Sequence, residues 1–70
     1  MNLKVETYSG AKLHEQPRRF YWQGKWQEVK EVLDRWQTPE YLCFRVRADN
    51  GREYVLRWQP ETDVWELSAV

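Results

Sequence analysis

The sequence of 70 residues predicts a small all-β fold, an antiparallel meander of five or six strands that closes into an SH3-like or partly open barrel. Two observations lead to this prediction. Aromatic residues make up 16% of the chain, and many occur at alternating positions, the period at which a strand directs side chains to one face. Short turn signals separate the alternating runs, and the length allows a single domain over residues 1–70.

The N-terminal part of the chain predicts two strands joined by a loop. Residues 3–8 alternate in polarity and form the first expected strand, which a Ser-Gly pair ends. Residues 11–17 combine mixed polar side chains with a proline, which predicts a loop. The second strand is expected over residues 18–22, with Phe20 and Trp22 on its inner face.

The third element is open to two interpretations. A turn at residues 23–25 leads into Trp26, and the apolar residues of segment 28–36 then fall at helical spacing. An α+β fold with a short helix at 28–36 is therefore the alternative. We favour a strand, because the segment leaves a hairpin directly and is short for an independent helix. A strand here needs a β-bulge near Lys30 and Glu31 to keep the apolar side chains inward.

The register of the next hairpin, residues 41–48 with 53–58, follows from polarity. Its Asp-Asn-Gly loop is expected to be three residues long, because a two-residue loop would mix polar and apolar side chains on each face. This register sets Arg47 beside Glu53 and puts Gly51 in the left-handed region at a G1 bulge. Two further pairs, Val46 with Tyr54 and Phe44 with Leu56, follow from the same register.

The last strand is expected over residues 64–67, after a turn at 59–63. An even-length loop there predicts two cross-strand pairs, Trp58 with Trp65 and Leu56 with Leu67. Large aromatic side chains are the means by which so short a chain fills its interior. Four tryptophans are assigned to the core on this basis: Trp22, Trp26, Trp58 and Trp65.

Composition excludes several classes of protein. A single cysteine excludes an internal disulfide, and one histidine with scattered carboxylates does not supply a structural zinc site, so neither metal nor other cofactor is expected. No apolar run has the length of a membrane span, and the first residues lack a signal peptide, which predicts a cytoplasmic protein without membrane contact. Eleven basic residues balance eleven acidic ones, which weakens a nucleic-acid-binding role.

Catalytic residues are not expected. The acidic residues Glu28, Glu31 and Asp34 have no second element of a site beside them in the sequence, so solvation of the surface explains them. Cys43 and His14 form a nucleophile and base only if the fold brings them together, and no local signature of a cysteine enzyme surrounds them. We therefore expect a protein that is not an enzyme, with Cys43 half-buried in a strand.

The candidate binding face consists of outward residues of the predicted sheet: Arg45, Arg47, Arg57 and Trp36. Guanidinium groups beside an exposed aromatic suit phosphate contact and base stacking. A tryptophan near a strand end also suits a protein-binding anchor. The alternatives are an ordinary solvated strand face and, for Trp36, a lid over the barrel mouth. Three further arginines join this face only if the topology allows it: Arg18, Arg19 and Arg35.

Four segments carry a resemblance to a known family: Pro17-x-x-Phe20-x-Trp22-x-Gly24 with Trp26, Val29-x-x-Val32-Leu33-Asp34-x-Trp36, Phe44-Arg45-Val46-Arg47-Ala48, and Thr62-Asp63-Val64-Trp65-Glu66-Leu67. The chain resembles a family of short bacterial proteins of unknown function, some of which are associated with Y-family-polymerase-like DNA-repair proteins. The aromatic residue after Gly24 departs slightly from the family spacing, and residues 1–16 lie outside the resemblance. The resemblance implies an accessory or adaptor role in a bacterial cell and supplies no catalytic residue.

The functional prediction is accordingly a small non-enzymatic interaction or adaptor domain, accessory to DNA repair, whose partner is another protein. The alternative is a weak single-stranded nucleic-acid-binding module that uses the arginine-rich face, and its affinity would fall steeply with salt. The sequence does not specify the partner or the oligomeric state.

Overall fold

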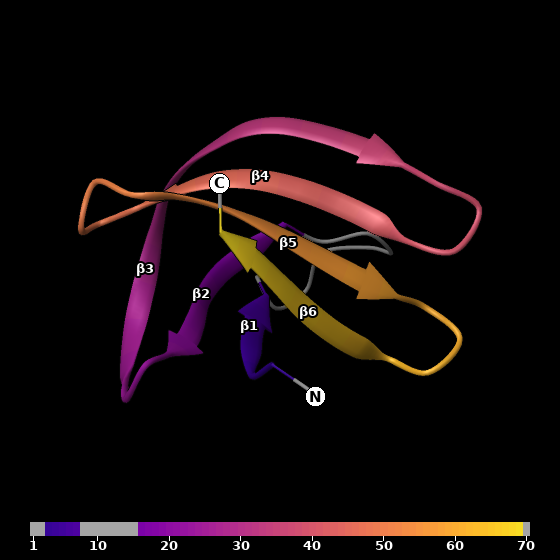
Figure 1. Cartoon of the computed structure of the whole chain (residues 1–70), viewed down its shortest axis with the longest axis horizontal. Coiled ribbons are helices and arrows are strands. Elements are labelled where there is room, and N and C mark those ends of the chain that lie inside the picture. Colours follow the sequence, from indigo (N-terminus) through magenta and orange to yellow (C-terminus); the bar gives the residue numbers. More distant parts are fainter. Residues whose placement is uncertain (1–2, 8–15, 70) are drawn as a thin grey trace.

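A computed structural model describes residues 3–7 and 16–69 of the chain. Over these residues the protein is a curled meander of six antiparallel strands that forms a half-barrel, and they contain no helix (Figure 1). The strands are neighbours in chain order: β1 (Val5–Thr7), β2 (Pro17–Trp22), β3 (Lys25–Gln37), β4 (Leu42–Ala48), β5 (Glu53–Gln59) and β6 (Val64–Ala69). The predicted all-β class and antiparallel meander are confirmed.

The long strand β3 bends the sheet into the half-barrel (Figure 1). Its first residues pair with β2, and from Val29 onward it pairs with β4. The register with β4 shifts between Val29 and Glu31, and again between Val32 and Asp34. Because each bulge adds a residue to one strand and increases the local twist, two bulges close together turn β3 from one half of the sheet to the other.

The bulges explain part of the helical spacing of segment 28–36, namely the step from Val29 to Val32, whereas Trp36 lies on the outer face. Val29, Val32 and Arg35 lie opposite residues whose side chains are buried in the core. Each bulge replaces the usual two-residue step between inward positions by a three-residue step, which imitates the period of a helix. The strand with a bulge near Lys30 is confirmed and the helix alternative is wrong, while the second bulge at Leu33 was not predicted.

The hairpin of β4 and β5 has the predicted register. Its predicted cross-strand pairs are present: Val46 with Tyr54, Phe44 with Leu56, and Arg47 with Glu53. The two pairs predicted between β5 and β6, Leu56 with Leu67 and Trp58 with Trp65, are also present. Gly51 has a φ of 83°, and its N–H donates to the carbonyl of Ala48 at 2.9 Å. The N–H of Ala48 donates in turn to the carbonyl of Arg52 at 2.9 Å, which completes the predicted turn with its G1 bulge.

The hairpin of β2 and β3 differs from the prediction by one residue. Its loop consists of Gln23 and Gly24, whose φ angles of 53° and 84° are both positive, as a type I′ turn requires. Lys25 therefore belongs to β3, and Tyr21 pairs with Trp26. A one-residue change in loop length turns every side chain of a strand to the other face. Trp26 is 36% exposed on the outer face, so its assignment to the core is wrong.

The core lies on the inner face of the curled sheet. Among the described residues it consists of Phe20, Leu42, Phe44, Val46, Ala48, Tyr54, Leu56 and Trp65. Trp22 and Trp58 are partly buried and pack against this cluster, so three of the four tryptophans assigned to the core contribute to it. The ring of Trp65 stacks between those of Phe44 and Trp58, with centroids 6.0 and 6.1 Å away.

The N-terminal part agrees with the prediction only in outline. The described part of the first strand, β1, is shorter than the predicted 3–8. The predicted end of that strand and most of the predicted loop at 11–17, including His14, lie outside the described residues. Pro17 belongs to β2, not to the loop, because it is buried and lies opposite Thr7. A proline is tolerated as the first residue of a strand, where its missing N–H interrupts no ladder.

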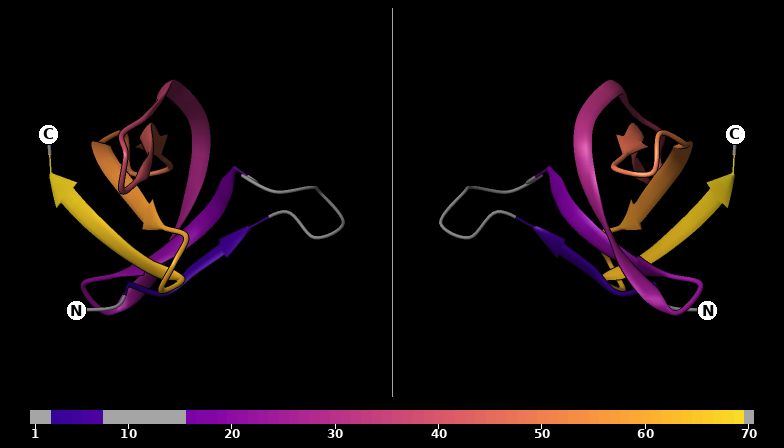
Figure 2. Two further views of the ribbon diagram at one scale, coloured as in Figure 1. Left: turned by 90° about the vertical axis from the view of Figure 1, so that its right-hand side faces the viewer. Right: turned by 90° about the vertical axis from the view of Figure 1, so that its left-hand side faces the viewer.

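The two edge strands of the sheet, β1 and β6, meet at one point. The N–H of Leu3 donates to the carbonyl of Trp65 at 2.9 Å. From this point the strands diverge toward their C-terminal ends (Figure 2). The half-barrel therefore has an open seam between β1 and β6.

Candidate binding surfaces

The four residues predicted to form a binding face share the outer side of one half of the sheet. Trp36 lies on β3, Arg45 and Arg47 lie on β4, and Arg57 lies on β5. Their neighbours along β4, including Phe44, are buried in the core, so the alternation of the strand directs the arginines outward. The structure thus brings the predicted residues together.

Each of the three arginines is bound by a glutamate. The pairs are Arg45 with Glu53 at 2.7 Å, Arg47 with Glu31, and Arg57 with Glu66 at 2.7 Å. Glu53 lies opposite Arg47 in the β4–β5 pairing, but its carboxylate accepts hydrogen bonds from Nε and Nη2 of Arg45, its diagonal neighbour on β4. The outer face is consequently a ladder of ion pairs from β3 to β6, in which no arginine of the predicted set offers an uncompensated charge.

The three additional arginines do not extend this ladder. Arg18 and Arg19 lie on β2, in the other half of the sheet. Arg19 donates to both carboxylate oxygens of Glu6 at 2.8 and 3.0 Å, and these hydrogen bonds hold the pKa of Glu6 below its usual value. Arg35 lies opposite Phe44, with its guanidinium carbon 5.7 Å from the ring centroid, on the other side of the strand from Trp36.

Trp36 and Cys43 lie opposite each other near the end of this outer face. Trp36 is 39% exposed, whereas Cys43 is 2% exposed, with Arg57 opposite it on the next strand. Burial raises the pKa of the Cys43 thiol, and the charge of Arg57 offsets part of this effect. A buried thiol with a raised pKa is a weak nucleophile. The arrangement does not favour Cys43 as a catalytic residue, and its predicted partner His14 lies outside the described residues.

The acidic residues considered for catalysis all have basic or backbone partners. These contacts are Glu28 with Arg19 at 3.9 Å, Glu31 with Arg47, and Asp34 with the N–H of Arg35 at 2.8 Å. Across residues 3–7 and 16–69, no group of three or more histidine, cysteine or acidic side chains could hold a metal ion. A catalytic or metal site needs several polar groups that point to one place and have no other partner. Among the described residues, these three acidic side chains are instead engaged in ion pairs or a backbone hydrogen bond.

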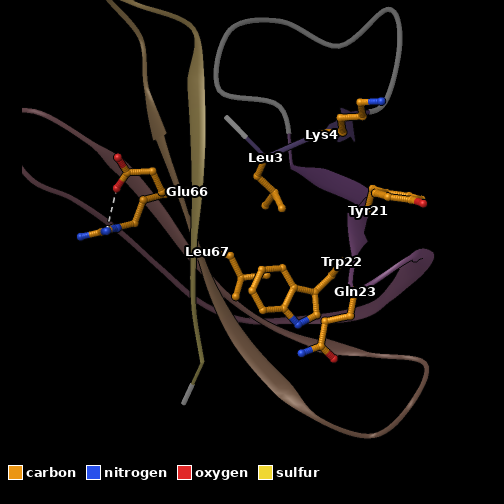
Figure 3. Close-up of a pocket in the computed structure, with 8 residues that line it drawn as sticks. Leu3, Lys4, Tyr21, Trp22, Gln23, Glu66 and Leu67 are labelled. Carbon is orange, nitrogen blue, oxygen red and sulfur yellow. Dashed lines mark hydrogen bonds and ion pairs between the residues drawn. The ribbon is translucent and has the colours of Figure 1, made fainter. Parts of the chain in front are cut away.

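A groove of about 570 Å³ lies at the open seam. We call it the seam groove, and its lining residues are Leu3, Lys4, Tyr21, Trp22, Gln23, Arg57, Glu66 and Leu67. Figure 3 shows Leu3 and Trp22 facing Leu67 across the groove, with Lys4 and Tyr21 at its outer rim. These three apolar residues are partly buried and pack against the core, so they form an apolar floor where the half-barrel does not close.

A patch of exposed aromatic side chains adjoins the seam groove. We call it the aromatic patch, and it consists of Tyr21, Trp26, Lys4 and Arg19. The rings of Tyr21 and Trp26 meet edge to face with their centroids 5.4 Å apart, and they are 40% and 36% exposed. The Lys4 ammonium lies 5.8 Å from the Tyr21 centroid, and the Arg19 guanidinium carbon lies 4.6 Å from that of Trp26. Lys4 and Tyr21 belong to both features, so the patch and the groove form one continuous surface.

The sequence contained a signal for the aromatic patch that the prediction did not use. A two-residue Gln23-Gly24 loop pairs Tyr21 with Trp26, and both then point away from the face that holds Phe20. The predicted turn at 23–25 is one residue longer than this loop, so the prediction missed the pair of Tyr21 with Trp26. Seam residues such as Leu3 and Leu67 had no such signal, because only the curl of the sheet brings the two ends of the chain together.

Within the described residues, no helix is long and apolar enough to cross a membrane. Comparisons with known proteins add no relative: no protein-family model matches the chain, no curated protein matches its sequence, and no solved structure matches its fold. The resemblance to the short bacterial family therefore stays a prediction that is based on the motifs alone.

Proposed function

We propose that the protein is a small non-enzymatic binding module that presents the aromatic patch and the seam groove to another protein. The observation that carries the proposal is the exposure of Tyr21 and Trp26, 40% and 36%, beside an apolar groove at an incompletely closed edge of the sheet. Aromatic side chains that border an apolar pocket are typical anchors of protein interfaces. Scattered exposed apolar residues would carry no such meaning, but these two rings are in contact, and Tyr21 lines the groove.

The arginine ladder supports a protein partner over a nucleic acid. Phosphate binding needs cations that exchange counterions for phosphates, and Arg45, Arg47 and Arg57 already have glutamate partners on the surface. The formal net charge of zero provides no long-range attraction for a polyanion. The family resemblance supports a more specific form of the proposal, in which the partner takes part in DNA repair in the bacterial cytoplasm.

Affinity capture from a lysate of the native host tests the proposal. The immobilised protein is compared with a Tyr21→Ala/Trp26→Ala double variant, and captured proteins are quantified by mass spectrometry. Loss of an anchor aromatic costs about 1 kcal/mol or more, so capture of the partner is expected to fall at least about fivefold. Circular dichroism confirms that the variant is folded.

Trp36→Ala is the matched control, because Trp36 is exposed to a similar degree, 39%, and does not line the groove. If Trp36→Ala reduces capture and the double variant does not, the interface is the predicted face of Trp36 with Arg45, Arg47 and Arg57 and not the aromatic patch. Capture of nucleic acid in place of protein, abolished by moderate salt, would overturn the proposal in favour of the nucleic-acid alternative.

A further inference from the structure

Within residues 3–7 and 16–69, the edge of β6 carries backbone groups that face the seam without a backbone partner. The carbonyl of Trp65 points out of the sheet, because it accepts the N–H of Leu3 at 2.9 Å. In an antiparallel strand, the backbone groups of alternate residues point to the same edge. The N–H and C=O of Leu67 therefore also point into the seam, and among the described residues no backbone group pairs with them. Such an edge is a template for a further strand.

The side chains around this edge specify what such a strand would carry. The floor of the seam groove, formed by Leu3, Trp22 and Leu67, is apolar and adjoins the core. An inward side chain of an added strand would enter this floor, since side chains alternate between the two faces. The next side chain along would point to the opposite face. Lys4 lines the groove from the side of Leu3 and Tyr21, across from β6 (Figure 3).

Lys4 differs from the other cation of the groove in its partners. Arg57 is bound to Glu66 at 2.7 Å. Within the described part of the chain, no acidic side chain forms an ion pair with Lys4, whose ammonium lies 5.8 Å from the Tyr21 ring centroid. A carboxylate is the group that this cation would attract, most strongly at low salt.

We propose that the seam groove binds an extended peptide segment of a partner protein, which adds to β6 as a further strand and carries an apolar residue directly beside an acidic one. The peptide backbone pairs with Leu67, the apolar side chain enters the groove, and the acidic side chain binds Lys4. This mode of recognition takes its affinity from backbone hydrogen bonds and its specificity from the pocket for alternate side chains. It rests on the proposed function and names the form of the partner.

Panning a phage-displayed library of random heptapeptides on the folded protein tests this inference. The enriched sequences are expected to share an apolar residue next to Asp or Glu. The best peptide, labelled with fluorescein, is then measured by anisotropy at low salt. Single N-methylation of each peptide amide is expected to abolish binding at alternate positions only, because only every second N–H of an added strand faces β6.

A charge exchange tests the contact with Lys4. Lys4→Glu is expected to weaken the peptide by up to about fivefold, the range of an exposed ion pair, and replacing the acidic residue of the peptide by Lys is expected to restore binding. Lys25→Glu is the matched control, because Lys25 is exposed on the neighbouring hairpin and does not line the groove. It is expected to leave the affinity unchanged within about twofold.

The outcomes separate this inference from the proposed function. Peptide binding that is lost in the Tyr21→Ala/Trp26→Ala variant, but is unchanged by every N-methylation and by Lys4→Glu, would overturn strand addition. The proposed binding module would remain supported. A library that yields no enriched peptide would overturn the inference. Sedimentation that shows a dimer of the free protein, displaced by no peptide, would overturn it by assigning the seam to a second copy of the chain.

Discussion

The two halves of the sheet use their outer faces differently. In the half formed by β4, β5 and β6, the inner side chains are buried and the outer arginines are each bound to a glutamate, so both faces have their partners within the chain. In the half formed by β1 and β2 with the start of β3, the outer face exposes Tyr21 and Trp26, and the edge next to it is open. The side chains of the first half, which we call the complete half, have partners within the chain, and only the edge of β6 is open there. The outer face of the second half, which we call the open half, lacks contacts that a partner would supply.

Residue type alone therefore does not identify a binding surface. The arginine row is the most conspicuous polar pattern in the sequence, yet its charges are compensated across the strands. The tryptophans suggest a core, yet Trp26 lies outside it because of one residue of loop length. The partners of a side chain, more than its chemical type, decide whether it is available for binding.

The largest expected effect sharpens this contrast through stability. Phe44→Ala, in the complete half, removes a side chain with no exposed surface and is expected to cost about 3–5 kcal/mol, comparable to the whole stability of so small a protein. Trp26→Ala, in the open half, removes a larger but exposed ring and is expected to cost less than about 1 kcal/mol. Urea unfolding followed by circular dichroism measures both. Similar urea midpoints for the two variants would show that Phe44 does not contribute more to the core than Trp26 does.

The next effect compares the glycines of two hairpin turns. Gly51 and Gly24 have φ angles of 83° and 84°, and a Cβ at either position would meet no other atom within 4 Å. Conformation alone therefore sets the cost, so Gly51→Val and Gly24→Val are both expected to lose on the order of 1–2 kcal/mol. Gly51→Asn is expected to be much milder, because asparagine tolerates the left-handed region. Thermal melting measures all three, and equal damage from Val and Asn at Gly51 would contradict the G1-bulge hairpin.

A smaller effect is expected from the ion pair of the open half. Hydrogen bonds from Arg19 lower the pKa of Glu6 in the folded protein. A lowered folded pKa stabilises the protein above the unfolded pKa of about 4.3, and this contribution disappears as the pH falls from there through the folded pKa. The melting temperatures of the parent and of Arg19→Gln should therefore differ at pH 6, and the difference should shrink as the pH falls below the usual pKa of a glutamate. A difference that is constant over this range would show that Arg19 acts through packing on Trp26 alone.

The smallest expected effect is the absence of nucleic-acid binding by the complete half. Because its arginines are compensated and the net charge is zero, single-stranded oligonucleotide should bind no more tightly than about 100 μM at physiological salt. Fluorescence anisotropy with a labelled strand at two salt concentrations measures this. Micromolar, salt-sensitive binding would show instead that the arginines of the complete half contact phosphates. Each of Arg45→Ala, Arg47→Ala and Arg57→Ala would then weaken binding and reduce the salt slope by about one unit.

The sequence by itself was sufficient for the β4–β5 hairpin and for its pairing with β6. Register in a short hairpin is a local property, since loop length and the alternation of polar and apolar residues determine it together. The positive φ of Gly51, the pair of Trp58 with Trp65 and the outward direction of Arg45 all followed from that local information. The first bulge of β3 was predictable for the same reason, because the inward residues had to stay inward.

Which of these surfaces remain available depends on contacts between strands that are distant in the sequence. The glutamate partners of Arg47 and Arg57 come from β3 and β6, and the seam groove joins Leu3 to Leu67 from opposite ends of the chain. These contacts depend on how far two bulges in β3 curl the whole sheet, and alternation along a single strand carries no information about that curl. The local pattern determined which face each side chain occupies, and the curvature of the complete sheet determined which side chains it meets there.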